Sequence, residues 1–571
     1  MEAGRRSIND IFNGSRALQI PFFQRSYVWK ESQWERFLED MEMISENNHP
    51  HFLGSVILKQ QQTPTDGNAG DIRTVIDGQQ RLTTLNLFFK VLCLKTDLNG
   101  SFNRVFRLMN DTVALDHNRN DREVFEQILD LTELNDISGE SNIVEAYRYF
   151  VDHINTETID FSRVLNNIMF VGIDLGNEED EQQIFDTINS LGVRLTTAEL
   201  LKNYFFNKQN IQQFVETWES VFEPDEETKR FWDRELIIGR MRRNNIDVFF
   251  HAFLQIKLQN NDLNITTVDK KRMSKVEGLF DSYKHFIGKF YNNDKSKLLG
   301  EIKEYALLYK DNIDYDVIDR DLSPDYGIDR INAIIFGLDN STLIPYVLYV
   351  LKEVSSLDQR NGIFKYLESY IMRRIINKDS NKNYNRLFSG SLISNKISNR
   401  TSLVELIEKK ADKTDAMPAD EEIKRSFNDN SLINRQTAGI LYLIESRIRN
   451  RAVHSTALLG MNRYSLEHLM PKKWENHWNG IQTEEAKQIR NKKLLTLGNL
   501  TIITASLNSS IRDADWTTKK AGRNNSHGLV HYASGIELIS SYLEYEEWNE
   551  EKIEERAQFL YEKAIQVWPS E

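Results

Sequence analysis

Thr74-Val75-Ile76-Asp77-Gly78-Gln79-Gln80-Arg81 is the stretch that decides the fold of the N-terminal part of this chain. It predicts a short apolar strand and a tight turn, which lead into a helix expected from about residue 82 to residue 98. Because Gly78 permits close approach of the backbone and the first helical N–H groups point outward, the turn is suited to hold an anion, and Arg81 would add a bidentate grip on phosphate. The simpler interpretation is a structural turn whose arginine pairs with an acid, since the chain has no Gly-x4-Gly-Lys-Ser/Thr pattern.

The elements around this stretch indicate a mixed α/β domain that ends near residue 210. Strands are expected at 52–58 and 168–175, and an aromatic-rich segment before them contains Tyr27 and Trp29. These two aromatics either line a pocket or belong to the core. From residue 211 to residue 425 the pattern is helical with few strand signals, and basic clusters at 240–243 and 373–374 either face DNA or lie on solvated helix faces.

Length and composition indicate a soluble protein of several domains. The chain has 571 residues, of which 40% are hydrophobic and 27% are charged, and domains commonly hold ~100–200 residues each. No apolar run approaches the ~18 residues that span a bilayer, and the first residues lack the apolar core of a signal peptide. We therefore expect a cytoplasmic protein without a membrane partner.

Cysteine usage and charge limit the ligands that the chain can bind. Cys93 is the only cysteine, which excludes an internal disulfide and a thiolate zinc cluster. Any metal must be held by His, Asn, Asp or Glu, which favours a hard cation such as Mg²⁺. The net charge is -13, yet residues 441–530 carry 14 Lys and Arg against 7 Asp and Glu, so the chain has a locally positive region.

That positive region contains residues suited to phosphodiester hydrolysis. Glu467 and His468 are adjacent, and Asn499 and Asn508 follow them. A histidine can activate water, while a carboxylate and an amide oxygen can hold a cation that stabilises the leaving oxygen. Asn499 lies in an apolar run, and we expect it to fix a loop by hydrogen bonds. Each residue also has an ordinary structural role when taken singly, such as a helix N-cap for Asn508.

Two lysines follow these residues and extend the predicted DNA contact. Lys519 and Lys520 lie on the helix expected after Asn508, where we expect them to contact phosphate. A nearby histidine, His477, competes with His468 for the catalytic role.

Together these motifs resemble the GmrSD-type modification-dependent restriction endonucleases. In the N-terminal part the resemblance is carried by Ile-Pro-x-x-Gln-Arg-x-Tyr-x-Trp at 20–29, Gly-Ser at 54–55 and Asp-Gly-Gln-Gln-Arg at 77–81. In the C-terminal part it is carried by Glu-His at 467–468, Gly-Asn-Leu at 498–500 and Asn-Ser at 508–509. The C-terminal part resembles the HNH nuclease domain of this family, and one position departs from its pattern. The last metal position is Asn508, where the HNH pattern has histidine.

The resemblance implies an α+β multidomain protein that is mostly helical. A ParB/sulfiredoxin-like α/β domain that binds and hydrolyses nucleotide is expected at 1–210, and a helical connecting domain at 211–425. A ββα-metal (HNH) nuclease domain with a C-terminal helix is expected at 426–571.

The resemblance also assigns roles to individual residues. His468 becomes the general base, Glu467 and Asn508 become ligands of Mg²⁺ or a similar divalent cation, and Asn499 becomes the asparagine that fixes the loop. A nucleoside triphosphate, ATP or GTP, is expected at nine N-terminal residues: Gln24, Arg25, Gly54, Ser55, Asp77, Gly78, Gln79, Gln80 and Arg81.

The expected function is that of a nucleotide-regulated, metal-dependent endonuclease that cuts modified foreign DNA, typically from phages. Double-stranded DNA and a nucleoside triphosphate are the expected partners, and a homodimer is consistent with an HNH site that cuts one strand at a time. Two alternatives stay open. One is a nucleotide-switched, ParB-like DNA-binding protein without cleavage activity, and the other is a toxin nuclease with unmodified targets.

Overall fold

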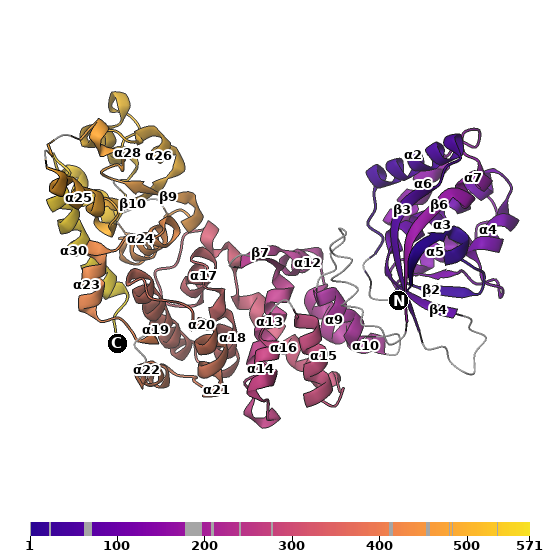
Figure 1. The fold of residues 1–571 in the computed structure, drawn as a ribbon, viewed down its shortest axis with the longest axis horizontal. Coiled ribbons are helices and arrows are strands. Elements are labelled where there is room, and N and C mark those ends of the chain that lie inside the picture. Colours follow the sequence, from indigo (N-terminus) through magenta and orange to yellow (C-terminus); the bar gives the residue numbers. More distant parts are fainter. Residues whose placement is uncertain are drawn as a thin grey trace. The chain divides into compact units, whose positions relative to one another are not determined.

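The chain folds into two compact units, Met1–Val215 and Glu216–Glu571 (Figure 1). The fold is α+β and mostly helical, as predicted. The predicted boundary between residues 425 and 426 falls inside the helix α23 (Asp420–Asp429) of the second unit. The computed structural model describes residues 2–21, 24, 26–61, 71–176, 197–206, 210–238, 241–275, 278–409, 415–452, 457–478, 480–481, 483–533 and 535–571.

The first unit is built on a six-stranded mixed sheet of order β1-β6-β3-β4-β2-β5. The pairs β1–β6 and β3–β4 are antiparallel, whereas β3–β6, β2–β4 and β2–β5 are parallel. The strands are β1 (Glu2–Ser7), β2 (Arg16–Gln19), β3 (His51–Gln60), β4 (Asp71–Asp77), β5 (Leu115–Asp116) and β6 (Ile168–Leu175). The strands predicted at 52–58 and 168–175 are confirmed by β3 and β6.

The helix α3 (Gln79–Lys95) is the centre of this unit. It begins before the predicted residue 82, because Gly78 has a left-handed backbone (φ 99°) and turns the chain directly into the helix. Every side chain from Leu82 to Cys93 is buried, and α3 packs against three other helices of the unit. The other helices described here are α1 (Ile8–Ile11), α2 (Glu31–Asn47), α4 (Asn99–Phe106), α5 (Arg122–Leu129), α6 (Asn142–His153), α7 (Phe161–Asn167), α9 (Thr197–Phe205) and α10 (Ile211–Phe214).

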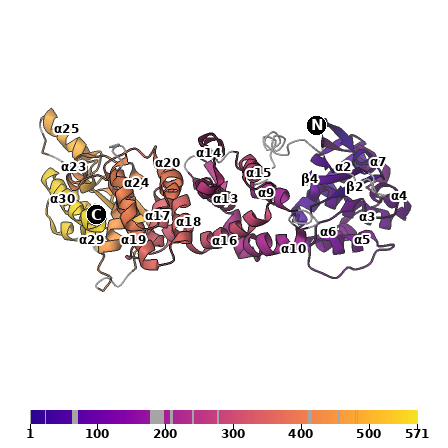
Figure 2. The same cartoon turned by 90° about the horizontal axis from the view of Figure 1, so that it is seen from below.

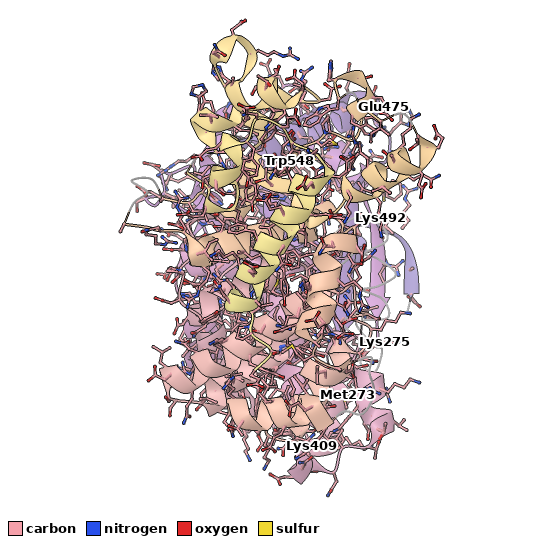
Figure 3. The ribbon with its side chains drawn as sticks, turned by 90° about the vertical axis from the view of Figure 1, so that its left-hand side faces the viewer. Met273, Lys275, Lys409, Glu475, Lys492 and Trp548 are labelled. Carbon is pink, nitrogen blue, oxygen red and sulfur yellow. The ribbon has the colours of Figure 1, made fainter. Side chains whose placement is uncertain are left out.

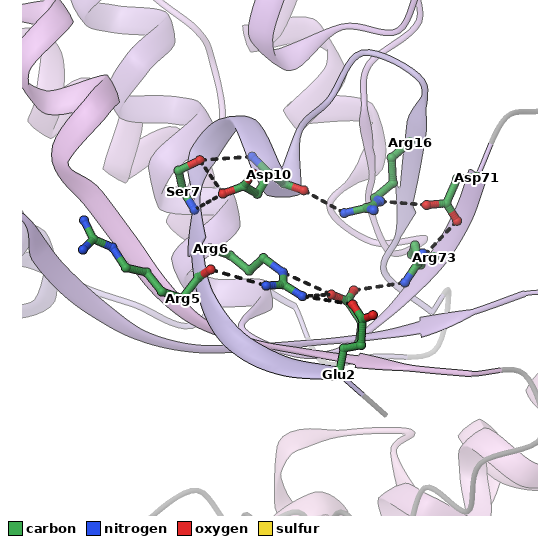
Figure 4. A network of polar contacts seen from close by, with 9 residues as sticks. Glu2, Arg5, Arg6, Ser7, Asp10, Arg16, Asp71 and Arg73 are labelled. Carbon is green, nitrogen blue, oxygen red and sulfur yellow. Dashed lines mark hydrogen bonds and ion pairs between the residues drawn. The ribbon is translucent and has the colours of Figure 1, made fainter.

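A network of arginines and acids joins four strands at the N-terminal end of β4 (Figure 4). Arg73 Nη1 donates to Asp174 Oδ1 at 3.0 Å, and Arg6 Nη2 donates to Asp174 Oδ2 at 3.1 Å. Asp71 accepts from Arg73 Nε at 2.7 Å and from Arg16 Nε at 2.9 Å. Each acid is shared by two arginines on different strands, so the network fixes β1, β2, β4 and β6 to one another.

The second unit, Glu216–Glu571, holds the predicted helical middle together with the predicted C-terminal module. A small hairpin of β7 (Glu235–Ile238) and β8 (Met241–Asn244) interrupts the helices, and Arg240 of the predicted basic cluster lies outside the described residues. The helices up to residue 409 are α11 (Ser220–Phe222), α12 (Glu226–Asp233), α13 (Asn245–Lys257), α14 (Thr267–Met273), α15 (Leu279–Phe290), α16 (Ser296–Asn312), α17 (Ile328–Gly337), α18 (Ile344–Glu353), α19 (Leu357–Ile376), α20 (Tyr384–Arg386), α21 (Leu392–Ser394) and α22 (Arg400–Lys409).

The C-terminal part of this unit is a short hairpin surrounded by helices. The strands β9 (Tyr464–His468) and β10 (Leu500–Thr504) pair antiparallel, and α24 packs against both. The remaining helices are α24 (Asn434–Ile448), α25 (Glu484–Lys493), α26 (Ala505–Ile511), α27 (Trp516–Ala521), α28 (Leu529–Tyr532), α29 (Glu537–Ser540) and α30 (Glu550–Val567).

A fully buried ion pair joins the helical middle to this C-terminal part. Arg330 on α17 bonds Glu368 on α19 through two guanidinium nitrogens, and Trp568 Nε1 donates to Glu368 Oε1 at 2.8 Å. Arg330 also donates to Leu443 O on α24 at 3.0 Å. Figures 1 and 2 both show α17, α19 and α24 side by side. The pair at 373–374 also belongs to this interior, because Arg373 and Arg374 are each only 1% exposed. Both alternatives for this pair, a face toward DNA and a solvated helix face, are therefore wrong.

Among the described residues, no helix has the length and apolar character needed to cross a bilayer.

Candidate functional site

The predicted catalytic residues lie on a ββα unit formed by β9, β10 and α26. His468 is the last residue of β9 and pairs with Leu500 of β10, and α26 follows β10 directly. Asn508 on α26 reaches back to β9, where its Nδ2 donates to Ser465 Oγ and to Leu466 O, both at 3.1 Å. The fold therefore places Asn508 against the strand that carries Glu467 and His468.

His468 has the protonation state that a general base needs. Its side chain is half-buried, and burial lowers its pKa to about 4, with further contributions from the positive charges of Lys472 and Lys519. The imidazole is therefore neutral at neutral pH. Its ring makes no hydrogen bond to any residue in the described part of the chain. A neutral ring with both nitrogens available can accept a proton from water.

Glu467 is buried and paired with Lys519, so the predicted contact of Lys519 with DNA is wrong. Lys519 is 0% exposed, and its ammonium donates to Glu467 Oε1 and, at 2.6 Å, to the carbonyl of His468. Burial raises the pKa of Glu467 and lowers the pKa of Lys519, and their mutual attraction offsets only part of each shift. Lys519 thus acts inside the protein as the counter-ion of Glu467 and as a support for the backbone of His468.

As arranged here, Glu467 and Asn508 do not form a site for a metal ion. The ammonium of Lys519 already holds one oxygen of Glu467. Asn508 has an amide oxygen to offer, but no three His, Cys, Asp or Glu side chains within the described ranges lie close enough to share a cation. A cation at Glu467 would share the carboxylate with the ammonium of Lys519, whose positive charge opposes it.

Asn499 fixes the segment that follows His468. Its Oδ1 accepts from Met470 N at 2.8 Å and from Trp548 Nε1 at 3.0 Å, while its Nδ2 donates to Met470 O at 2.8 Å and to Leu494 O at 3.0 Å. Asn499 is 0% exposed, and Trp548, labelled in Figure 3, lies just before α30. All hydrogen-bonding positions of this amide are therefore used within the protein.

The surface next to α26 carries positive charge from the predicted Lys520 and from two arginines that the sequence analysis did not single out. Lys520 is partly buried and donates to Tyr545 O at 2.5 Å. A hollow of 340 Å³ instead lies beside Asn508 and is lined by Ser509, Ser510, Arg512, Arg523, Ser526 and His527. Arg512 and Arg523 are exposed and can meet an anion there. Arg512 follows Asn508 by one helical turn, a spacing that could have pointed to it.

In the first unit, the predicted nucleotide residues meet where β3, β4 and α3 come together. Ser55 Oγ donates to Asp77 Oδ2 at 3.0 Å, and Arg81 Nη1 donates to Ser55 O at 2.6 Å. Arg81 also lies 3.8 Å from Asp77 Oδ2. Gly54 adjoins the same guanidinium, because a Cβ on Gly54 would lie 3.0 Å from Arg81 Nε. The arginine is held by a structural acid and a carbonyl, and about a fifth of its side chain is exposed.

Two features of this place bear on the kind of ligand that it can bind. The N-cap of α3 is Gly78, which provides no side-chain hydrogen bond to the first turn of the helix. The positive end of the helix dipole therefore lacks a side-chain cap. In addition, Gln79 Oε1 is buried with no hydrogen-bond partner among the described residues. As an acceptor, it fits a donor group of a ligand, such as a hydroxyl or an amine, and not its phosphate.

The remaining residues predicted to bind nucleotide are Gln24, Arg25 and Gln80. Gln80 Oε1 accepts from Val28 N at 2.9 Å, so its side chain supports the preceding segment. Gln24 is half-buried, and Arg25 lies outside the described residues. Of the two roles considered for Tyr27, the structure favours the core, because Tyr27 is 3% exposed and its hydroxyl lies 2.5 Å from Thr84 Oγ1.

Comparison with known families adds to this geometry. The family model described as GmrSD restriction endonuclease, N-terminal domain, matches residues 8–206. The model described as GmrSD restriction endonucleases, C-terminal domain, matches residues 417–563. The two matches together span more than half of the chain and include both the turn at Asp77 and the ββα unit. No curated protein sequence matches the chain.

Proposed function

This chain belongs to the GmrSD restriction endonuclease family and is a nuclease that acts on DNA, and we propose that it is a nucleotide-regulated HNH endonuclease that cuts modified foreign DNA. The observation that carries the proposal is the ββα unit, on which the neutral imidazole of His468 lies at the end of a strand buttressed by Asn508. The role is antiviral restriction inside the cell.

His468 starts the cleavage step by accepting a proton from a water molecule. The water oxygen forms a bond to phosphorus while the bond between phosphorus and the leaving oxygen breaks. The low pKa of His468 supports this assignment, because the ring is ready to accept the proton at neutral pH. Arg512 and Arg523 hold the DNA backbone in place of Lys519.

A divalent cation such as Mg²⁺ is proposed from the family resemblance, with Glu467 and Asn508 as its ligands. The ammonium of Lys519, which already holds Oε1 of the Glu467 carboxylate, opposes the binding of this cation. Glu467 and Asn508 would hold such a cation, and the chemistry that it would supply is charge stabilisation of the leaving oxygen.

A nucleoside triphosphate, ATP or GTP, is proposed at the turn of Asp77, Gly78, Gln79, Gln80 and Arg81. The uncapped start of α3 and the unpartnered Gln79 Oε1 support this site. Hydrolysis of the nucleotide there licenses cleavage by the second unit. A homodimer on DNA is part of the proposal, since one HNH site per chain cuts one strand at a time.

The test is digestion of modified phage DNA and of its unmodified counterpart, with and without ATP, GTP and EDTA. His468→Ala is expected to lower cleavage by about 10²–10⁴-fold, the usual contribution of a general base. His477→Ala tests the competing histidine, which is exposed and close in sequence, and it is expected to cut at the wild-type rate. Arg81→Ala is expected to remove the effect of nucleotide.

Each contrary outcome points to a definite alternative. Cleavage by His468→Ala at the wild-type rate contradicts the catalytic assignment. A wild-type protein that binds DNA without cutting it is the ParB-like DNA-binding protein, and equal cutting of both DNAs identifies the toxin nuclease.

A further inference from the structure

A cavity of 810 Å³ lies in the helical middle, and its lining shares no residue with either place described above. Its walls come from α13, α14, the start of α18 with the preceding turn at Ser341–Leu343, and the segment from α20 to α21. These residues lie between the two regions that match family models. The cavity therefore belongs to the part of the chain for which neither match supplies a role.

The cavity is lined by positive charge, hydroxyl groups and amides. Arg243, Lys270, Lys271 and Arg386 contribute cationic side chains, and none of the described residues that line it is acidic. The lining hydroxyls are those of Thr267, Ser274, Ser341, Thr342, Ser389, Ser391 and Ser394. Arginine, lysine and hydroxyl donors together are the groups that recognise phosphate oxygens.

The wall also has an apolar side suited to a ring. Val248, Ala252, Leu258, Ile344 and Pro345 line the same cavity. Small-molecule sites commonly measure about 300–1,000 Å³ and combine an apolar lining with a few placed polar groups. An anion with an attached apolar ring matches both the size and the two kinds of wall.

The N-terminus of the helix α18 lies at the cavity wall. The helix α18 begins at Ile344, and its first residues line the wall without a side-chain cap at the N-terminus. Its dipole thus adds positive potential to that of the lysines and arginines.

Two hydrogen bonds connect the helices that form one wall of the cavity. Lys270 is half-buried and donates to Gln259 Oε1 at 3.0 Å, and Gln255 Nε2 donates to the carbonyl of Met273, a residue labelled in Figure 3. These bonds hold α13 and α14 at a fixed spacing beside the cavity.

The outer rim retains cations whose charge is only partly compensated. Arg386 has a side chain that is 66% exposed and lies 3.6 Å from Asp415 Oδ2. Lys271 is exposed on α14. A contact at 3.6 Å is too long for a strong hydrogen bond, so Arg386 keeps donors to offer a ligand.

We infer that this cavity is a binding site for a nucleoside phosphate, whose phosphate meets Lys270, Lys271 and Arg386 and whose base meets the apolar wall. The nucleoside phosphate comes either as a free nucleotide or as one nucleotide of a DNA strand, since both present the same phosphate and ring. The site is distinct from the one proposed at Asp77, because it lies in the other unit of the chain.

The experiment is photolabelling of the full chain with azido-ATP and, in a second arm, with a short oligodeoxynucleotide that carries an azido base, followed by mapping of the labelled peptides. Label is expected in peptides from residues 245–274 and 385–394. Label from azido-ATP identifies a free nucleotide, and label from the oligodeoxynucleotide identifies a DNA strand. Label at residues 54–81 reports on the N-terminal site independently, so failure of one site is distinguished from failure of the other.

Charge-reversal variants complete the test. Lys271→Glu with Arg386→Glu is expected to lower label in these peptides by roughly tenfold or more, as for loss of a charged hydrogen bond. Arg272→Glu is the matched control, because Arg272 is exposed on the same helix but does not line the cavity. The inference is overturned if neither probe labels these peptides in the wild-type chain, or if the double variant is labelled as strongly as Arg272→Glu.

Discussion

Replacement of Asn499 should loosen the segment that follows His468. In Asn499→Ala, the N–H of Met470 and the indole N–H of Trp548 both lose their acceptor in a buried place. A buried donor without a partner costs about 1–3 kcal/mol, so two donors cost about 2–6 kcal/mol. At about 1.4 kcal/mol for each factor of ten, opening of this segment becomes roughly tenfold to ten-thousandfold more frequent.

The assay is native-state hydrogen exchange, followed by mass spectrometry of the peptide from residue 464 to residue 471. The amide of Met470 reports the loss directly, because it is the donor that Asn499 accepts. Asn499→Leu is the volume control, since it fills the space but makes none of the four hydrogen bonds. If Asn499→Leu restores the protection of the wild type, the loss came from a cavity and the hydrogen-bond argument is refuted.

Two further predictions concern buried titratable groups. Lys519→Met should lower the free energy of unfolding by about 3–5 kcal/mol, because it leaves the charge of Glu467 buried without a partner. The double variant Lys519→Met with Glu467→Met should recover most of that loss, because both charges are then replaced by apolar groups. Urea unfolding that finds the double variant as unstable as the single variant contradicts this prediction. Burial lowers the pKa of His117 to about 3, so the unfolded chain takes up this proton first as the pH falls below the usual value of about 6.5. The free energy of unfolding should therefore be about 2 kcal/mol lower at pH 5 than at pH 7. His117→Gln should remove this part of the loss at acid pH. If urea unfolding shows the same pH dependence for His117→Gln as for the wild type, the prediction is wrong.

Local patterns in the sequence predicted parts of the structure around both candidate sites. The turn at Asp77 was predictable because a strand, a glycine and a helix follow one another within a few residues. The position of Asn499 was predictable for a similar reason, since a polar residue inside an apolar run must find partners in the interior. Both predictions needed only residues that are close in sequence.

The role of Lys519 could not be found from its charge, because its partner Glu467 lies 52 residues away. Two adjacent lysines on a helix normally indicate a solvated face. One clue was available in Trp516, which shares a helical face with a residue three positions later. Since Trp516 is 4% exposed and Lys519 is 0% exposed, the apolar residue marked the buried side of α27. The cavity in the helical middle lay further out of reach, because segments from residue 243 to residue 394 form its walls.

The buried pair of Arg330 and Glu368 links the helical middle to the candidate site at His468. Both side chains are at most 1% exposed, and their bonds to Leu443 and Trp568 tie α17 and α19 to the elements that surround β9 and β10. Removing one partner of such a pair leaves an uncompensated charge in the interior, so the two parts are expected to unfold together. A ligand in the middle cavity therefore stabilises the same cooperative unit that positions His468, whereas a nucleotide at Asp77 acts on the other unit.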